Sequence, residues 1–134
     1  MDQRGRSRAG TGVWVVALIL AAPLTARAAT FTVNSTADAV DVSPGDGVCA
    51  TADGSCTLRA AIQEANALAG ADTVVLPAGT YLLTLAGAGE DGAATGDLDI
   101  TGDLIIAGAG AASTVVDGNG LDRVFHVDPA AAGI

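Results

Sequence analysis

The chain has 134 residues, of which half are hydrophobic and only 3% aromatic, and its formal net charge is −9. It contains no lysine, so arginine supplies all of its fixed positive charge. Such an acidic chain repels the phosphates of nucleic acids and of anionic lipids, which excludes nucleic acid as an expected partner. An acidic, hydrated surface is typical of a secreted protein that must stay dissolved.

Residues 1–28 have the organisation of a secretory signal peptide, and residues 29–134 are expected to form the remaining domain. The basic stretch "RGRSR" precedes the apolar run "VWVVALILAAPL", which is short for a membrane span. The following "ARA" ends on a small residue and predicts cleavage between Ala28 and Ala29. The alternative is an uncleaved membrane anchor. Cleavage predicts a secreted or cell-envelope protein without stable membrane insertion.

A short strand is expected at residues 31–33, and an irregular loop rich in Gly and Asp follows it. The loop ends with "CATADGSC", which holds Cys49 and Cys56. In an oxidising compartment this pair predicts a disulfide. The spacing does not fit a CxxC redox pair, and no second Cys/His pair is present to complete a zinc site. The short bridged loop predicts a stabilisation of about 2–3 kcal/mol.

The stretch "CTLRAAIQEANALAG" has the pattern of one amphipathic helix, predicted over residues 57–69. Thr57 is the predicted N-cap, and Gly70 is expected as the left-handed residue at the C-terminal end. Small and aliphatic side chains recur at helical spacing on one face: Leu58, Ala61, Ile62, Ala65, Leu68 and Ala69. Polar side chains fall on the other side: Arg59, Gln63, Glu64 and Asn66.

The remaining segments are short, rich in β-branched residues and separated by Gly, Asp, Asn or Pro turns. They lie at residues 73–76, 81–85, 98–100, 104–108, 113–118 and 123–127. Few aromatic residues are available for a sandwich core, whereas stacked aliphatic ladders need none. The pattern predicts an all-β fold, a parallel β-solenoid of about two coils in which segments 104–108 and 123–127 lie one coil apart, at roughly 20 residues. A small antiparallel sheet is the alternative, because periodicity does not fix strand direction.

A β-helix exposes an apolar cross-section and unpaired strand edges at its ends, so each end needs a cover. The helix predicted at residues 57–69 is expected to cap the first coil. At the other end, segment 123–127 is followed only by "DPAAAGI", in which Pro129 cannot donate to a continuing ladder. The final coil is therefore expected to be open and to support self-association.

Three stretches also resemble a known family. "CTLRAAIQEAN", preceded by "FTVNSTADAVD" and followed by "ADTVVLPAGTYLLTL", resembles the CSLREAI domain, and "GAGEDGAATGDLDITGDLIIAGAGAASTVVDGNGLDRVFHV" is similar to the segment that follows that domain. The resemblance extends from Phe31 to about Val127. It implies an exported bacterial protein with a right-handed parallel β-helix of the pectin-lyase-like type.

The sequence departs from the family pattern in two ways. The family's Ser is Thr57 here, which keeps the helix cap, but the family's Glu is Ala60, which removes half of a capping box. In similar proteins the β-helix continues further, so the resemblance implies that this chain is the N-terminal part of a longer protein.

Candidate catalytic and metal-binding residues are few. Polysaccharide lyases of this architecture need acidic Ca²⁺ ligands and a basic residue, for which Asp97, Asp99, Asp103 and Arg123 are the candidates. Asp97 and Asp99 share one face of a strand, but Asp103 lies beyond a Gly turn, and the spacing fits no calcium-binding motif. His126 is a lone histidine with no nucleophile motif beside it. We expect no catalytic residue, metal site or cofactor in this segment.

Two functions remain open. The first is a non-catalytic secreted or cell-surface β-helix module, structural or adhesin-like, whose partner is an extracellular carbohydrate or a surface protein. The second is the capping N-terminus of an extracellular polysaccharide lyase or hydrolase whose active site lies beyond residue 134. Downstream sequence separates them: clustered Asp, Lys and Arg on one strand ladder favour the enzyme, whereas Asn/Gly/Thr-rich repeats favour the module.

Overall fold

The computed structural model describes residues 26–128, so most of the predicted signal peptide and the stretch from Pro129 onward lie outside the described residues. The described chain is mostly strands and loops with one helix, α1 (Leu58–Ala67). The strands are β1 (Thr30–Thr32), β2 (Asp72–Leu76), β3 (Gly79–Leu82), β4 (Leu98–Ile100), β5 (Leu104–Gly108), β6 (Thr114–Asp117) and β7 (Phe125–Val127).

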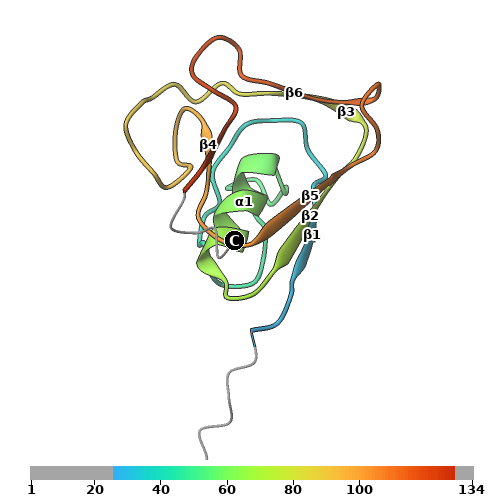
Figure 1. Ribbon diagram of the computed structural model, residues 1–134, viewed down its shortest axis with the longest axis vertical. Helices are drawn as coiled ribbons and strands as arrows, with labels where there is room; N and C mark the ends of the chain where they lie inside the picture. The colour runs from blue at the N-terminus through green and yellow to red at the C-terminus, as the bar shows by residue number, and fades with distance from the viewer. Residues whose placement is uncertain (1–25, 129–134) are drawn as a thin grey trace, which may run out of the picture.

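The strands of the described chain pair in parallel, in three sheets with the orders β1-β2-β5, β3-β6 and β4-β7. Strands β2, β3 and β4 are called the first layer here, and β5, β6 and β7, which pair with them in the same order, the second layer (Figure 1). The register aligns Val74 with Ile106 and Leu98 with Phe125. The antiparallel alternative is therefore wrong.

The expected stacking of segment 104–108 against segment 123–127 is also wrong. β5 pairs with β2, and β7 pairs with β4. The chain visits all three sheets before it returns to the first, so segments that are close in sequence belong to different sheets. A long loop at residues 83–97 separates β3 from β4 in the first layer, which removes the even spacing that periodicity needs.

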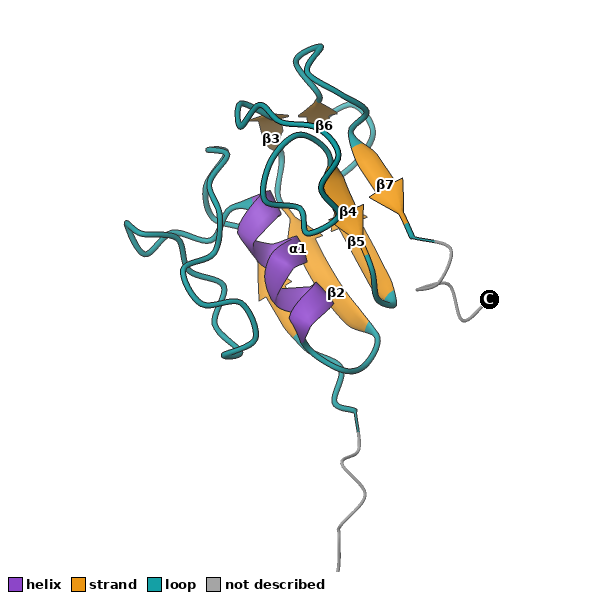
Figure 2. Ribbon diagram, turned by 90° about the vertical axis from the view of Figure 1, so that its left-hand side faces the viewer, coloured by secondary structure: helices purple, strands orange, loops and turns teal. Residues whose placement is uncertain are grey.

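The core lies between α1 and the first layer. α1 packs against β2 and β4, and Figure 2 shows it on one side of the first layer with β7 on the other. The inward side chains of this region are buried: Phe31, Val33, Leu58, Ala61, Ile62, Val74, Leu76, Tyr81, Leu83 and Leu98. Burial of these side chains, all but two of which are aliphatic, is the main stabilising contribution, because it removes apolar surface from water.

The start of α1 is fixed by Thr57, which is its N-cap. Thr57 Oγ1 accepts a hydrogen bond from the N–H of Ala60 at 3.1 Å and donates one to the carbonyl of Ala39 at 2.7 Å. Ala60 is fully buried, so a carboxylate at this position would lose its contact with water.

The helix ends earlier than the sequence pattern predicts. Its last residue is Ala67, and Leu68 is the C-cap in an extended conformation, so Gly70 does not end the helix. Gly70 nevertheless adopts a φ of +128°, and a Cβ on it would lie 3.0 Å from the carbonyl oxygen of Arg27. A glycine is therefore required at this turn for backbone geometry and for the close passage of residues 26–28.

Cys49 and Cys56 form the predicted disulfide, with Cα atoms 5.1 Å apart. The bridge closes the loop immediately before Thr57 and so holds the residues that lead into α1. None of the helical structure within residues 26–128 has the length and apolar character needed to cross a bilayer.

Candidate functional site

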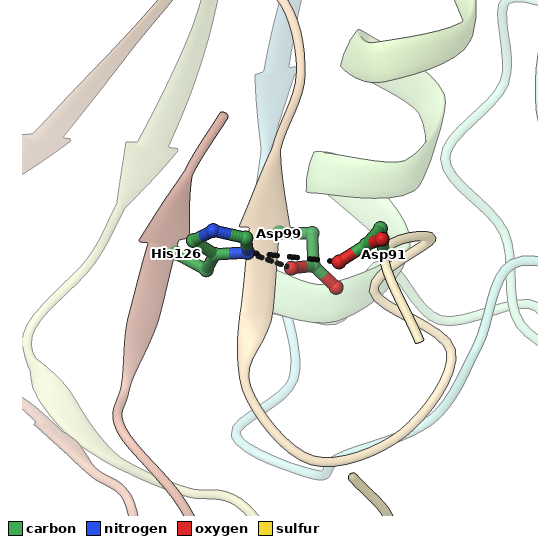
Figure 3. Close-up of side chains that lie close together, drawn as sticks. All are labelled: Asp91, Asp99 and His126. Atoms are coloured by element: carbon green, nitrogen blue, oxygen red, sulfur yellow. Dashed lines mark hydrogen bonds and ion pairs between the residues drawn. The ribbon is translucent and has the colours of Figure 1, made fainter. Parts of the chain in front are cut away.

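Three side chains that can bind a proton or a metal meet on the outer side of β4 and β7: Asp91, Asp99 and His126 (Figure 3). Asp99 on β4 and His126 on β7 are register partners, so they lie side by side on neighbouring parallel strands. His126 Nδ1 lies 2.8 Å from Asp99 Oδ1 and 3.9 Å from Asp91 Oδ1. One potential ligand atom from each residue lies within 4.8 Å of the other two.

The contacts of Asp99 give this cluster a structural role. Asp99 is buried and its second oxygen accepts the N–H of Ala93 at 3.0 Å, whereas the Asp91 side chain is 81% exposed. The other oxygen, Oδ1, is hydrogen-bonded to the His126 ring. Both oxygens of Asp99 are thus engaged within the protein. The geometry suits a histidine that satisfies a buried carboxylate by a hydrogen bond.

A second pair lies beside this cluster. Arg123 donates through Nε to Asp97, whose side chain is buried, while the Arg123 side chain is 57% exposed. The hydrogen bond and the charge of Asp97 raise the pKa of Arg123 above its ordinary value. Arg123 is therefore engaged with Asp97. Of the candidates named from the sequence, only Asp103 is absent from this edge, because it is exposed in the turn before β5.

The polar side of α1 is buried and makes many hydrogen bonds, which the helical pattern does not reveal. Arg59, Gln63 and Glu64 are all buried. The loops at residues 34–55 and 83–97 cover this side, so the helix is enclosed on both of its faces. Buried polar groups need partners, and here loop backbone groups supply nearly all of them.

Arg59 joins three segments of the chain. Its Nε and Nη2 donate to the carboxylate of Asp38 at 2.5 and 3.1 Å, and its guanidinium also donates to the carbonyls of Ala93 at 2.9 Å and Gly96 at 2.8 Å. Burial alone would raise the pKa of Asp38, but Arg59 and two backbone N–H groups outweigh it and hold that pKa below 3.8.

Glu64 and Gln63 hold the loop before the disulfide. The Glu64 carboxylate accepts the N–H groups of Gly45, at 2.7 Å, and Gly47. Both glycines have positive φ, at +101° and +88°, so the loop turns its amides toward the helix. Gln63 Oε1 accepts the N–H of Asp41 at 2.8 Å. These bonds organise a loop that has no regular secondary structure of its own.

Asn66 occupies the free edge of β4. In the described residues β4 pairs with a strand on one side only, β7. On the other side Asn66 Nδ2 donates to the carbonyl of Asp99 at 2.8 Å, and Asn66 Oδ1 accepts the N–H of Thr101 at 3.0 Å. The amide thus replaces part of a neighbouring strand. A signal for Gln63 and Glu64 exists in the sequence, because the N–H groups of the Gly- and Asp-rich loop before the helix need acceptors.

The second layer carries an apolar hollow of about 370 Å³. Leu76, Ile106, Val116 and Phe125 line it together with small residues of the turn between β5 and β6. In register with the buried Leu98, Phe125 is 36% exposed. Side chains at the same inward positions are therefore buried in the first layer and partly exposed in the second.

The chain was also compared with known proteins. No model of a protein family matches it, and neither a curated protein nor a solved structure does.

Proposed function

We propose that this chain is a non-catalytic module that caps the N-terminal end of a right-handed parallel β-helix in a secreted or cell-surface protein. The observation that carries the proposal is the difference between the two layers. α1 covers the first layer, whose inward side chains are buried, whereas the inward side chains of the second layer remain partly open. A cap that shields one side and leaves the other ready for stacking has this asymmetry.

The strand pairing supports the architecture. Each first-layer strand has a parallel partner in the second layer, and the order of the three sheets is the same in both. Further layers could be added in the same way on the edges of β5, β6 and β7 that have no partner strand within residues 26–128. The hydrogen bonds of Arg59, Glu64 and Asn66 would then fasten the cap and its loops to the first layer.

Export is part of the proposal. The predicted signal peptide, the disulfide and the acidic composition all fit an oxidising compartment outside the cytoplasm. A long β-helix face is a suitable surface for an extracellular carbohydrate or a surface protein. The resemblance to the CSLREAI domain points to the same class of protein.

The alternative is that the cap belongs to an extracellular polysaccharide lyase or hydrolase whose active site lies beyond residue 134. The acidic and basic residues on and just before β4 and β7 give it little support, because Asp97 is bound to Arg123 and Asp99 to His126. A free acid and base aimed at one hollow would be needed for such chemistry. The second-layer hollow has an apolar lining instead.

The experiment is the addition of a third layer. A segment that repeats residues 104–127 is joined after Val127, and the control carries the same segment before Ala29, where α1 covers the layer. We expect the C-terminal fusion alone to unfold at higher urea concentration and to be monomeric. If the chain without added layers is a compact monomer and the C-terminal fusion brings no gain, the capping function is wrong.

A further inference from the structure

Asp72, the first residue of β2, is a buried carboxylate that is only half satisfied. Its side chain is fully buried, with 0% exposure. Oδ1 accepts a hydrogen bond from the backbone N–H of Ala29 at 2.7 Å, whereas Oδ2 has no hydrogen-bond partner within the described chain. An ionised carboxylate held out of water in this way is costly and calls for a compensating positive charge.

No side chain within residues 26–128 supplies that charge. Arg59, Arg123 and His126 pair with other carboxylates. The main chain of Arg27 passes over Gly70 nearby, but the residue itself is exposed. Asp103, in the turn before the neighbouring strand β5, contributes its carbonyl, which accepts the N–H of Asp72 at 3.0 Å.

The atom beside Asp72 is the nitrogen at which the predicted signal peptide ends. Cleavage after Ala28 adds water across the Ala28–Ala29 peptide bond: the Ala28 carbonyl becomes a carboxylate, and Ala29 N becomes an amine that takes up a further proton at neutral pH. A single amide N–H then becomes an ammonium group with three donors. Such a group can serve both Oδ1 and Oδ2 and also neutralise the charge.

The position of this nitrogen does not depend on the leader. The carbonyl of Ala29 accepts the N–H of Thr73 at 2.8 Å, and the next residue, Thr30, pairs with Thr73 in the β1–β2 register. Residues 26–28 are exposed, whereas Ala29 is half-buried and packs against the core. The predicted cleavage point therefore coincides with the boundary between exposed residues and residues that pack against the core.

We propose that Asp72 is the binding site for the α-ammonium group that signal-peptide removal creates at Ala29. The ion pair forms only in the processed chain, so cleavage itself stabilises the β1–β2 edge of the cap. The inference rests on the proposed export, but its test does not, because the amine can be generated without any export.

Acylation reports on this α-amine specifically, because the chain has no lysine and the processed protein therefore has no other primary amine. The processed chain is released from a fusion by a specific protease so that it begins at Ala29, and is allowed to react with an amine-acylating reagent near neutral pH. Labelling is followed by mass spectrometry. Asp72→Asn is the variant, and Asp103→Asn, which removes an exposed negative charge nearby, is the control.

We expect acylation to be about tenfold slower or more in the wild type and in Asp103→Asn than in Asp72→Asn, because an ion pair worth one pKa unit lowers the free amine tenfold. A second comparison covers the case in which Asp72→Asn fails to fold. The wild-type chain that begins at Ala29 should melt several degrees above the same chain that begins at Ala28. Equal labelling in all three proteins, or equal melting of the two wild-type chains, would overturn the proposal and would leave the export hypothesis untouched.

Discussion

Arg59 and Asp38 form a buried ion pair that connects the first turn of α1 to the loop that follows β1. Their side chains are 0% and 2% exposed, and Nε lies 2.5 Å from Oδ1. The same guanidinium also holds carbonyl groups of the loop at residues 83–97. This one side chain thus joins the two loops that cover the polar side of α1. Its removal would leave Asp38 Oδ1 and the loop carbonyls without this donor, although Asp38 Oδ2 would still accept two backbone N–H groups.

Replacement of Arg59 by Lys should therefore be destabilising. An ammonium keeps the charge but cannot reproduce the planar fork that reaches Asp38, Ala93 and Gly96 together. We expect a loss of about 2–4 kcal/mol in the free energy of unfolding, measured with urea. The matched control is Arg123→Lys, whose side chain is largely exposed, with an expected loss below about 1 kcal/mol. Equal losses in the two variants would contradict the role assigned to Arg59.

Asp38 should make the stability of the protein depend on pH in the acid range. The folded state holds the pKa of Asp38 below 3.8, so the unfolded chain takes up a proton first as the pH falls. The stabilisation is complete well above pH 3.8 and is lost as the pH drops through the lower folded value. Urea unfolding between about pH 6 and pH 3 should show the gap between wild type and Asp38→Asn narrowing toward low pH. A gap that stays constant would argue against this assignment.

Glu64 should control the order of the loop before the disulfide. In Glu64→Ala the amides of Gly45 and Gly47 lose their acceptor, and we expect a loss of about 1–3 kcal/mol. Hydrogen exchange at these two amides should become faster than at Ala61, whose N–H bonds to Thr57 within the helix. Glu64→Gln keeps one acceptor oxygen, so its free energy of unfolding should lie between those of the wild type and Glu64→Ala. Unchanged exchange at Gly45 would show that the loop stays ordered without the Glu64 carboxylate.

Removal of the disulfide should destabilise the protein without abolishing its fold. Cys49→Ser with Cys56→Ser opens a short loop, for which we expect a loss of about 2–3 kcal/mol. Thermal unfolding of the double variant and of reduced wild-type protein should agree within error. Peptide mapping without reductant should yield one linked species that contains both cysteines. Two alkylated thiols in periplasmic protein would argue against the bridge.

The open second layer should mediate self-association. Val116 lines the apolar hollow, and its neighbour Val115 is on the other face of β6 with 46% of its surface exposed. We expect the wild type to form larger species with rising concentration in sedimentation experiments, Val116→Glu to reduce this, and Val115→Glu to leave it unchanged. Circular dichroism would verify that each variant is folded. A wild-type protein that stays monomeric at every concentration would rule out the association.

The sequence alone predicted the local features of this protein. Short-range sequence patterns reveal three of these features: Thr57 as N-cap, the start of α1 and the bridge between Cys49 and Cys56. Each depends on residues that are close together in the chain. The positions of the strands followed from β-branched segments between turn residues for the same reason. The end of the helix was placed too late, because Gly70 serves the turn into β2 and the passage of Arg27.

Only the tertiary structure decided which strands are neighbours and why the polar side of α1 is buried. Val74 lies beside Ile106, and Leu98 beside Phe125, because the chain passes through three sheets before returning, with loops of unequal length between them. Arg59 and Glu64 look like residues of a solvated face until the loops fold over them. Parallel pairing and loop amides join residues far apart in the chain, and no local periodicity encodes such partners.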